Sequence, residues 1–81
     1  MVVVQLTEWK PHLQKVSLLR LIQQHAGLPL AEAKACVDRH LNGEVVTLHI
    51  KDFVTAELFI REASEIGAVA RIPQGSPPRQ T

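Results

Sequence analysis

The 81-residue sequence has little that would support covalent cross-linking or a surplus of charge. It has one cysteine, Cys36, no tyrosine, one tryptophan and two phenylalanines. A single cysteine excludes an intramolecular disulfide and is typical of a reducing compartment, so we expect a cytoplasmic protein. Nine basic residues against eight acidic ones leave a net charge of +1. Nucleic-acid binding requires clustered positive charge, so we expect no nucleic-acid partner.

Long apolar runs are also missing. No run approaches the ~18 residues that would indicate a membrane span, so we expect no membrane partner. The first residues, MVVVQLTEW, have neither a basic leader nor a small-residue cleavage site, and we interpret them as a strand and not as a signal peptide. A chain of this length suits one domain that buries roughly 60% of its unfolded surface.

Motifs for catalysis are absent as well. The glycines are isolated, and neither GxGxxG nor GxxxxGK[ST] occurs. Acidic residues such as Glu62 and Glu65 are scattered as on a solvated helix face, and no local signature surrounds Cys36. We therefore expect no enzyme and no cofactor. Cys36 and His40 lie four apart, which leaves a small metal or thiol protein as a third hypothesis, although structural zinc needs four ligands.

The hydrophobic pattern that is present predicts alternating strands and helices. Period-two alternation predicts strands over residues 2–8, 44–50 and 68–72. Helical spacing predicts a first helix from about residue 15 to Gly27, a second over 29–40 and a third over 53–66 with Asp52 as its N-cap. The element order is therefore β-α-α-β-α-β.

This order predicts an α+β fold, a two-layer sandwich with a three-stranded antiparallel or mixed sheet and three helices on one face. The second and third strands form a right-handed crossover unit and are parallel, and the first strand lies between them, antiparallel to both. We expect one domain over residues 1–72 and a disordered tail over 73–81, which holds three prolines and no apolar side chain after Ile72. A second copy could pack on the open sheet face, so we expect a monomer or a weak homodimer.

The first helix is apolar on two sides. Leu18, Leu21 and Ile22 share one arc, which we predict to face the core, whereas Val16 and Leu19 lie on another. In a chain this short, a second apolar arc favours contact with a protein partner.

The same region carries a family resemblance. Its elements are Lys15-Val16, an apolar helix over 18–22, the hinge Gly27-Leu28-Pro29-Leu30, and Glu32-Ala33-Lys34. Over residues 2–72 the chain resembles the C-terminal domain of the bacterial ribosomal stalk protein, the seven/twelve protein of the large subunit. The resemblance implies the same fold and a stand-alone interaction module for translation. Its implied partner is a translational GTPase or another ribosome-associated factor, and its implied partner-binding residues are Lys15, Val16, Leu19, Arg20 and Lys34.

The departures from that family are specific. Gln23 stands at a position that is usually basic, and Ile60 at one that is usually charged, which suggests an extra contact surface if Ile60 is exposed. The chain begins at the first strand, so we expect it to lack the usual stalk anchor.

A second resemblance provides an alternative. The Clp protease adaptor family has a similar fold, and its peptide site uses an Asn-Asp loop before the first helix and a histidine at the end of the second. Here His40-Leu41-Asn42-Gly43 is similar to the latter, whereas residues 8–12 lack Asn-Asp. The alternative function is therefore a proteolytic adaptor that binds a peptide or degron.

Overall fold

The computed structural model describes residues 1–73 and has the predicted element order. The elements are β1 (Val2–Trp9), α1 (Lys15–Ala26), α2 (Leu30–Leu41), β2 (Val46–Ile50), α3 (Phe53–Glu65) and β3 (Ala68–Arg71). The predicted α+β, β-α-α-β-α-β fold is confirmed, with small differences at the element ends. Of the predicted disordered tail, only Pro73 lies within the described residues.

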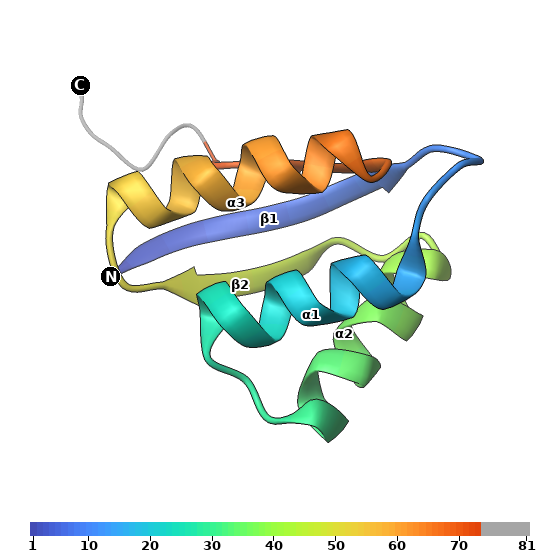
Figure 1. The fold of residues 1–81 in the computed structure, drawn as a ribbon, viewed down its shortest axis with the longest axis horizontal. Coiled ribbons are helices and arrows are strands. Elements are labelled where there is room, and N and C mark those ends of the chain that lie inside the picture. The colour runs from blue at the N-terminus through green and yellow to red at the C-terminus, as the bar shows by residue number, and fades with distance from the viewer. Residues whose placement is uncertain (74–81) are drawn as a thin grey trace.

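The sheet has β1 at its centre. The strand order is β2-β1-β3, and β1 is antiparallel to both neighbours, with Val4 opposite Leu48 and Leu6 opposite Ala70. Figure 1 shows the helices gathered on one side, with α3 along β1 and α1 along β2. The predicted insertion of the first strand between the other two is therefore confirmed.

A bulge in β1 changes which residues face the helices. Between Leu6 and Glu8 the register shifts, so that Glu8 pairs with Val69 and Trp9 pairs with Ala68. Ala68 is buried on the helix side, and a directly paired residue faces the same side of a sheet. Trp9 therefore lies at the helix side of the sheet end, where 42% of its surface stays exposed.

The core fills the space between the sheet and the helices. Val4, Leu6, Leu18, Ile22 and Phe59 have no exposed surface, and Phe59 is the largest fully buried side chain. Leu18 and Ile22 thus occupy the predicted core face of α1, while Leu21 is half-buried beside it. These contacts fix α1 and α3 against the sheet and so fix the hollows between neighbouring elements.

The predicted N-cap of α3 is present. The Asp52 carboxylate accepts a hydrogen bond from the Thr55 N–H at 2.7 Å. We expect Asp52→Ala to lower the midpoint of thermal unfolding by about a few degrees, because it leaves a helix N–H unpaired, whereas Asp52→Asn keeps an acceptor and most of the stability. Circular dichroism melts of the three proteins at pH 7 measure this. Equal midpoints for Asp52→Ala and the parent chain would contradict it.

Candidate functional site

An open groove of about 420 Å³ lies between α1 and α2. Its lining comes from the first half of α1 and from one face of α2: Lys15, Val16, Leu19, Leu30, Lys34, Val37, Asp38 and Leu41. Two local features set the groove. Gly27 ends α1 with a left-handed φ of 68°, and Pro29 holds an extended φ of −62° immediately before α2, so a short connection turns the second helix back along the first.

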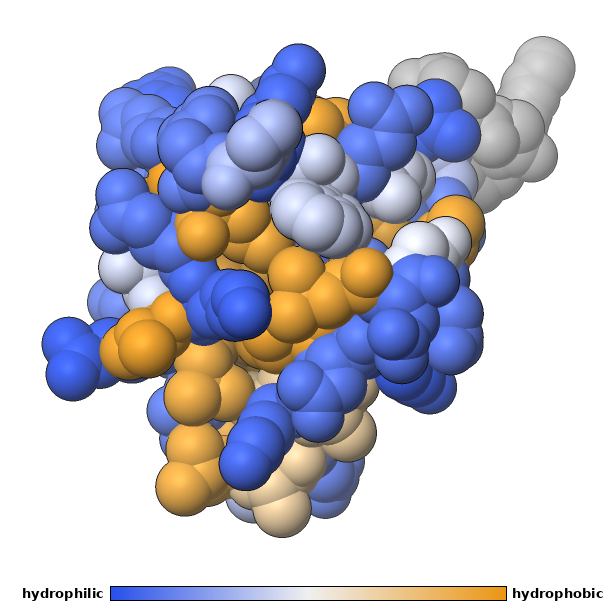
Figure 2. All heavy atoms as spheres, turned by 90° about the vertical axis from the view of Figure 1, so that its right-hand side faces the viewer, coloured by the Kyte–Doolittle hydropathy of each residue, from blue (hydrophilic) through white to orange (hydrophobic). Residues whose placement is uncertain are grey.

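The groove has a buried apolar floor and exposed apolar walls. Val37 is 6% exposed, and Leu19 and Leu41 are half-buried against the core. Val16 and Leu30 are 64% and 58% exposed. Figure 2 shows hydrophobic residues gathered between hydrophilic ones on the side of the molecule where α1 begins and α2 ends. Exposed apolar surface of this kind, rimmed by polar residues, is typical of a protein-binding surface.

The rim of the groove carries more positive than negative charge. Lys15 and Lys34 contribute two ammonium groups, and Asp38 one carboxylate. Within residues 1–73, neither lysine has a carboxylate within ion-pair distance, since the single ion pair in this part of the chain joins His25 and Glu62. The two ammonium groups are thus available to an acidic group on a partner.

The structure brings together four of the five predicted partner-binding residues. Lys15, Val16, Leu19 and Lys34 line the groove, whereas Arg20 lies in another hollow of about 310 Å³ beside Glu62 and Glu65. Arg20 thus faces the boundary of α1 with α3 and does not share the groove with the other four.

Sequence reasoning missed four lining residues of α2. They are Leu30, Val37, Asp38 and Leu41. The helical spacing of Leu30, Val37 and Leu41 is visible in the sequence and places them on one face of the helix predicted over 29–40. A face that is buried at its centre and exposed at its edge produces the same spacing, so the pattern could identify the face without showing that α1 leaves it partly open.

His25 fixes the opposite side of α1. Its Nε2 lies 2.8 Å from Glu62 Oε1, and its side chain is 6% exposed. The ring also contacts Phe59 edge to face, with centroids 6.0 Å apart. This contact holds α1 against α3.

Cys36 and His40 lie inside the fold. Cys36 is 7% exposed, and His40 has no exposed surface. Within residues 1–73, neither ring nitrogen of His40 has a hydrogen-bond partner, and burial lowers the pKa of its imidazole below the ordinary value. No group of three or more His, Cys, Asp or Glu side chains that could hold a metal ion occurs among residues 1–73.

No protein-family model matches the sequence, and no curated protein matches it. Among residues 1–73, each helix is too short or too polar to cross a membrane.

Proposed function

We propose that this domain is a protein-interaction module that binds a segment of a partner protein in the groove between α1 and α2. One observation carries the proposal: four residues selected from the sequence line a single apolar groove, and the two lysines on its rim form no ion pair within residues 1–73. A partner would bury the exposed walls at Val16 and Leu30, and each apolar residue buried contributes favourable free energy. The lysines would orient an acidic segment.

The stalk-protein resemblance supplies the proposed class of partner. It implies a translational GTPase or another ribosome-associated factor, and the implied residues coincide with the groove except for Arg20. The direct test is therefore binding of purified translational GTPases, each loaded with a non-hydrolysable GTP analogue, to the immobilised domain.

Two substitutions test the groove. Val16→Asp places a charge on an exposed apolar wall, and Lys34→Glu reverses one rim charge. We expect each to weaken GTPase binding by about tenfold, equivalent to about 1.4 kcal/mol, as measured by biolayer interferometry.

Matched controls lie elsewhere on the surface. Val54 is 76% exposed on α3, and Lys51 lies outside the groove, so Val54→Asp and Lys51→Glu repeat the chemical changes at a distance. Unchanged binding in both controls is expected. If Val16→Asp and Lys34→Glu bind as tightly as the parent domain, the groove is not the interface.

The two other hypotheses receive less support from the geometry. A degron-binding histidine must be reachable, but His40 has no exposed surface. The metal or thiol hypothesis has Cys36 and His40 on one buried helix face, with no third ligand gathered beside them within residues 1–73. We therefore propose neither as the function.

A further inference from the structure

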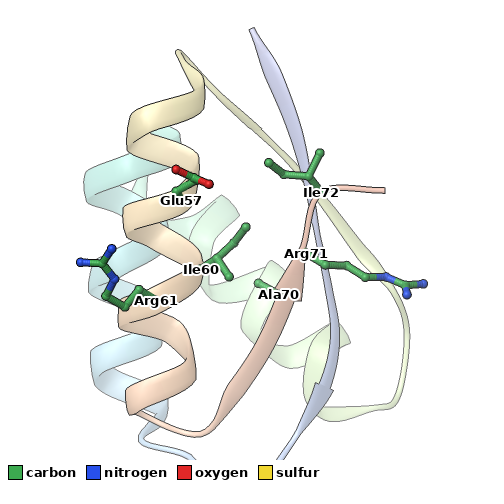
Figure 3. Close-up of a pocket in the computed structure, with 6 residues that line it drawn as sticks. All are labelled: Glu57, Ile60, Arg61, Ala70, Arg71 and Ile72. Carbon is green, nitrogen blue, oxygen red and sulfur yellow. The ribbon is translucent and has the colours of Figure 1, made fainter. Parts of the chain in front are cut away.

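A second hollow, of about 430 Å³, lies between α3 and the edge strand β3. It is lined by Glu57, Ile60, Arg61, Ala70, Arg71 and Ile72. Figure 3 shows Ile60 and Ile72 pointing into the space between the helix and the strand, whereas Arg61 and Arg71 point away from it on opposite sides. Ile60 is half-buried, so part of it faces this hollow and part packs on the core.

The hollow exists because β3 carries small side chains on its inner face. Ala68 and Ala70 face the helices from β3, whereas Val46, Leu48 and Ile50 face them from β2. Ala70 lines the hollow, and its small side chain leaves room there that a larger residue would occupy.

The edge of β3 beside this hollow has no strand partner within residues 1–73. The sheet order places β3 last, paired with β1 alone. An edge strand presents backbone N–H and C=O groups that can pair with another extended chain. When a groove runs beside such an edge, the backbone supplies affinity and the groove selects alternate side chains.

We propose that the β3 edge binds an extended peptide segment of a partner as a fourth strand. A large apolar side chain of this segment would enter the hollow over Ala70, between Ile60 and Ile72. The neighbouring side chains of an added strand point to the opposite face of the sheet, where Arg71 extends. Arg71 has no carboxylate within ion-pair distance in residues 1–73, and the hollow is lined by two arginines and one glutamate. The segment therefore alternates apolar and acidic residues.

A second copy of this chain is a poorer occupant. Its β3 would offer Ala68 and Ala70 to the hollow, its Ile72 already lines the equivalent hollow of its own copy, and the inward residues of its β2 are at most 2% exposed beneath its own helices. The chain's own residues 73–81 have no apolar residue besides proline, and three of the nine are prolines, which cannot donate a backbone hydrogen bond. Neither supplies the large apolar side chain that the hollow would accept.

The experiment uses an end-blocked seven-residue peptide in which leucine alternates with glutamate. Titration into the ¹⁵N-labelled full chain should shift the backbone amide signals of β3 and of residues around Ile60, while signals of the α1–α2 groove stay in place. Two control peptides should each bind at least about tenfold more weakly. One has the same composition but adjacent leucines, so it loses the alternation of apolar and acidic side chains. The other is N-methylated at alternate amides, so it loses backbone hydrogen-bond donors.

Two variants locate the contact. Arg71 is exposed, so Arg71→Glu should leave the melting temperature nearly unchanged. The variant should bind the leucine–glutamate peptide at least about tenfold more weakly than the parent chain does. A peptide in which lysine replaces glutamate should bind the variant again. Ala70→Leu fills the hollow from inside and should also exclude the peptide. Arg39→Glu, an exposed charge reversal on α2, is the matched control.

Three results would overturn the proposal. The first is equal binding of the alternating, rearranged and N-methylated peptides, and the second is no binding of any of them. The third is a stable dimer of the chain, seen by light scattering, that Arg71→Glu dissociates, because a second copy would then occupy the edge.

Discussion

Replacing Gly67 with alanine is expected to lower the free energy of unfolding by about 3 kcal/mol, the largest loss that we expect from a single methyl group in this domain. Two physical terms add at this position. Gly67 has φ +97°, which is unfavourable for a residue with a Cβ atom. An added Cβ would also lie 2.8 Å from the Leu13 Cα, a backbone atom that can move only with its loop.

The clash falls on a loop that positions the start of α1. The Lys10 N–H donates to the Gly67 carbonyl at 2.8 Å, and the Gln14 N–H donates to the Ile66 carbonyl at 2.9 Å. Moving Leu13 away from a new Cβ would strain both hydrogen bonds. Since Lys15 directly follows this loop, the same glycine helps to hold the beginning of the α1–α2 groove.

Two other glycines separate the cost of a positive φ from the cost of the clash with Leu13. Gly27 and Gly43 have φ of +68° and +88°, but an added Cβ would meet no atom within 4 Å at either. We expect Gly27→Ala and Gly43→Ala to cost about 1 kcal/mol each, from backbone conformation alone. Urea unfolding of the three variants measures the difference. If Gly67→Ala unfolds at the same urea concentration as Gly43→Ala, the approach of Leu13 does not constrain the fold.

The fold could be predicted from the sequence because each element has its own local signal. Alternation marked the strands, Gly27 and Pro29 marked the turn between α1 and α2, and Asp52 marked the start of α3. The bulge in β1 had no such signal. It depends on how β1 pairs with β3, which follows more than 50 residues later, and it alone decides the side on which Trp9 lies.

The candidate site was only partly predictable for the same reason. The two apolar arcs of α1 indicated an exposed side, and Val16 is indeed exposed there, whereas Leu19, on the same arc, lines the groove but is half-buried against the core. The position of Arg20 depends on α3, where Glu62 and Glu65 lie beside the same hollow. A hollow lined by residues so distant in sequence cannot be predicted from helical spacing alone. The small inner residues of β3 are visible in the sequence. The hollow is also lined by residues of α3, so it could not be predicted without the placement of that helix.

Acidification below pH 6.5 is expected to destabilise the domain through His40. Burial lowers the pKa of the folded imidazole from the ordinary value of 6.5, and no group within residues 1–73 accepts a hydrogen bond from either ring nitrogen. Above pH 6.5 both folded and unfolded chains keep this histidine neutral. As the pH falls below 6.5, the His40 imidazole binds a proton in the unfolded chain but stays neutral in the folded chain. The free energy of unfolding then decreases by up to about 1.4 kcal/mol per pH unit until the lowered folded pKa is reached.

The variant His40→Leu isolates this contribution. Leucine has no polar atom to desolvate, so the variant should be more stable than the parent by about 1 kcal/mol at pH 7.5, and its advantage should widen as the pH falls to 5. The difference between the free energies of unfolding of the two proteins, each measured by urea unfolding, removes the contributions that they share. His49→Leu, at an exposed histidine of β2, is the matched control for replacing a histidine by leucine.

The shape of the difference curve decides between two environments for His40. A buried imidazole without partners gives a difference that is constant above pH 6.5 and grows below it. An imidazole that gains a partner when it is charged would have a raised folded pKa, and its stabilising effect would be lost as the pH rises. The prediction is contradicted if the stability difference between His40→Leu and the parent chain decreases on acidification or stays constant from pH 7.5 to 5. Either result would show that the ring does not stay neutral and unpaired at the end of α2.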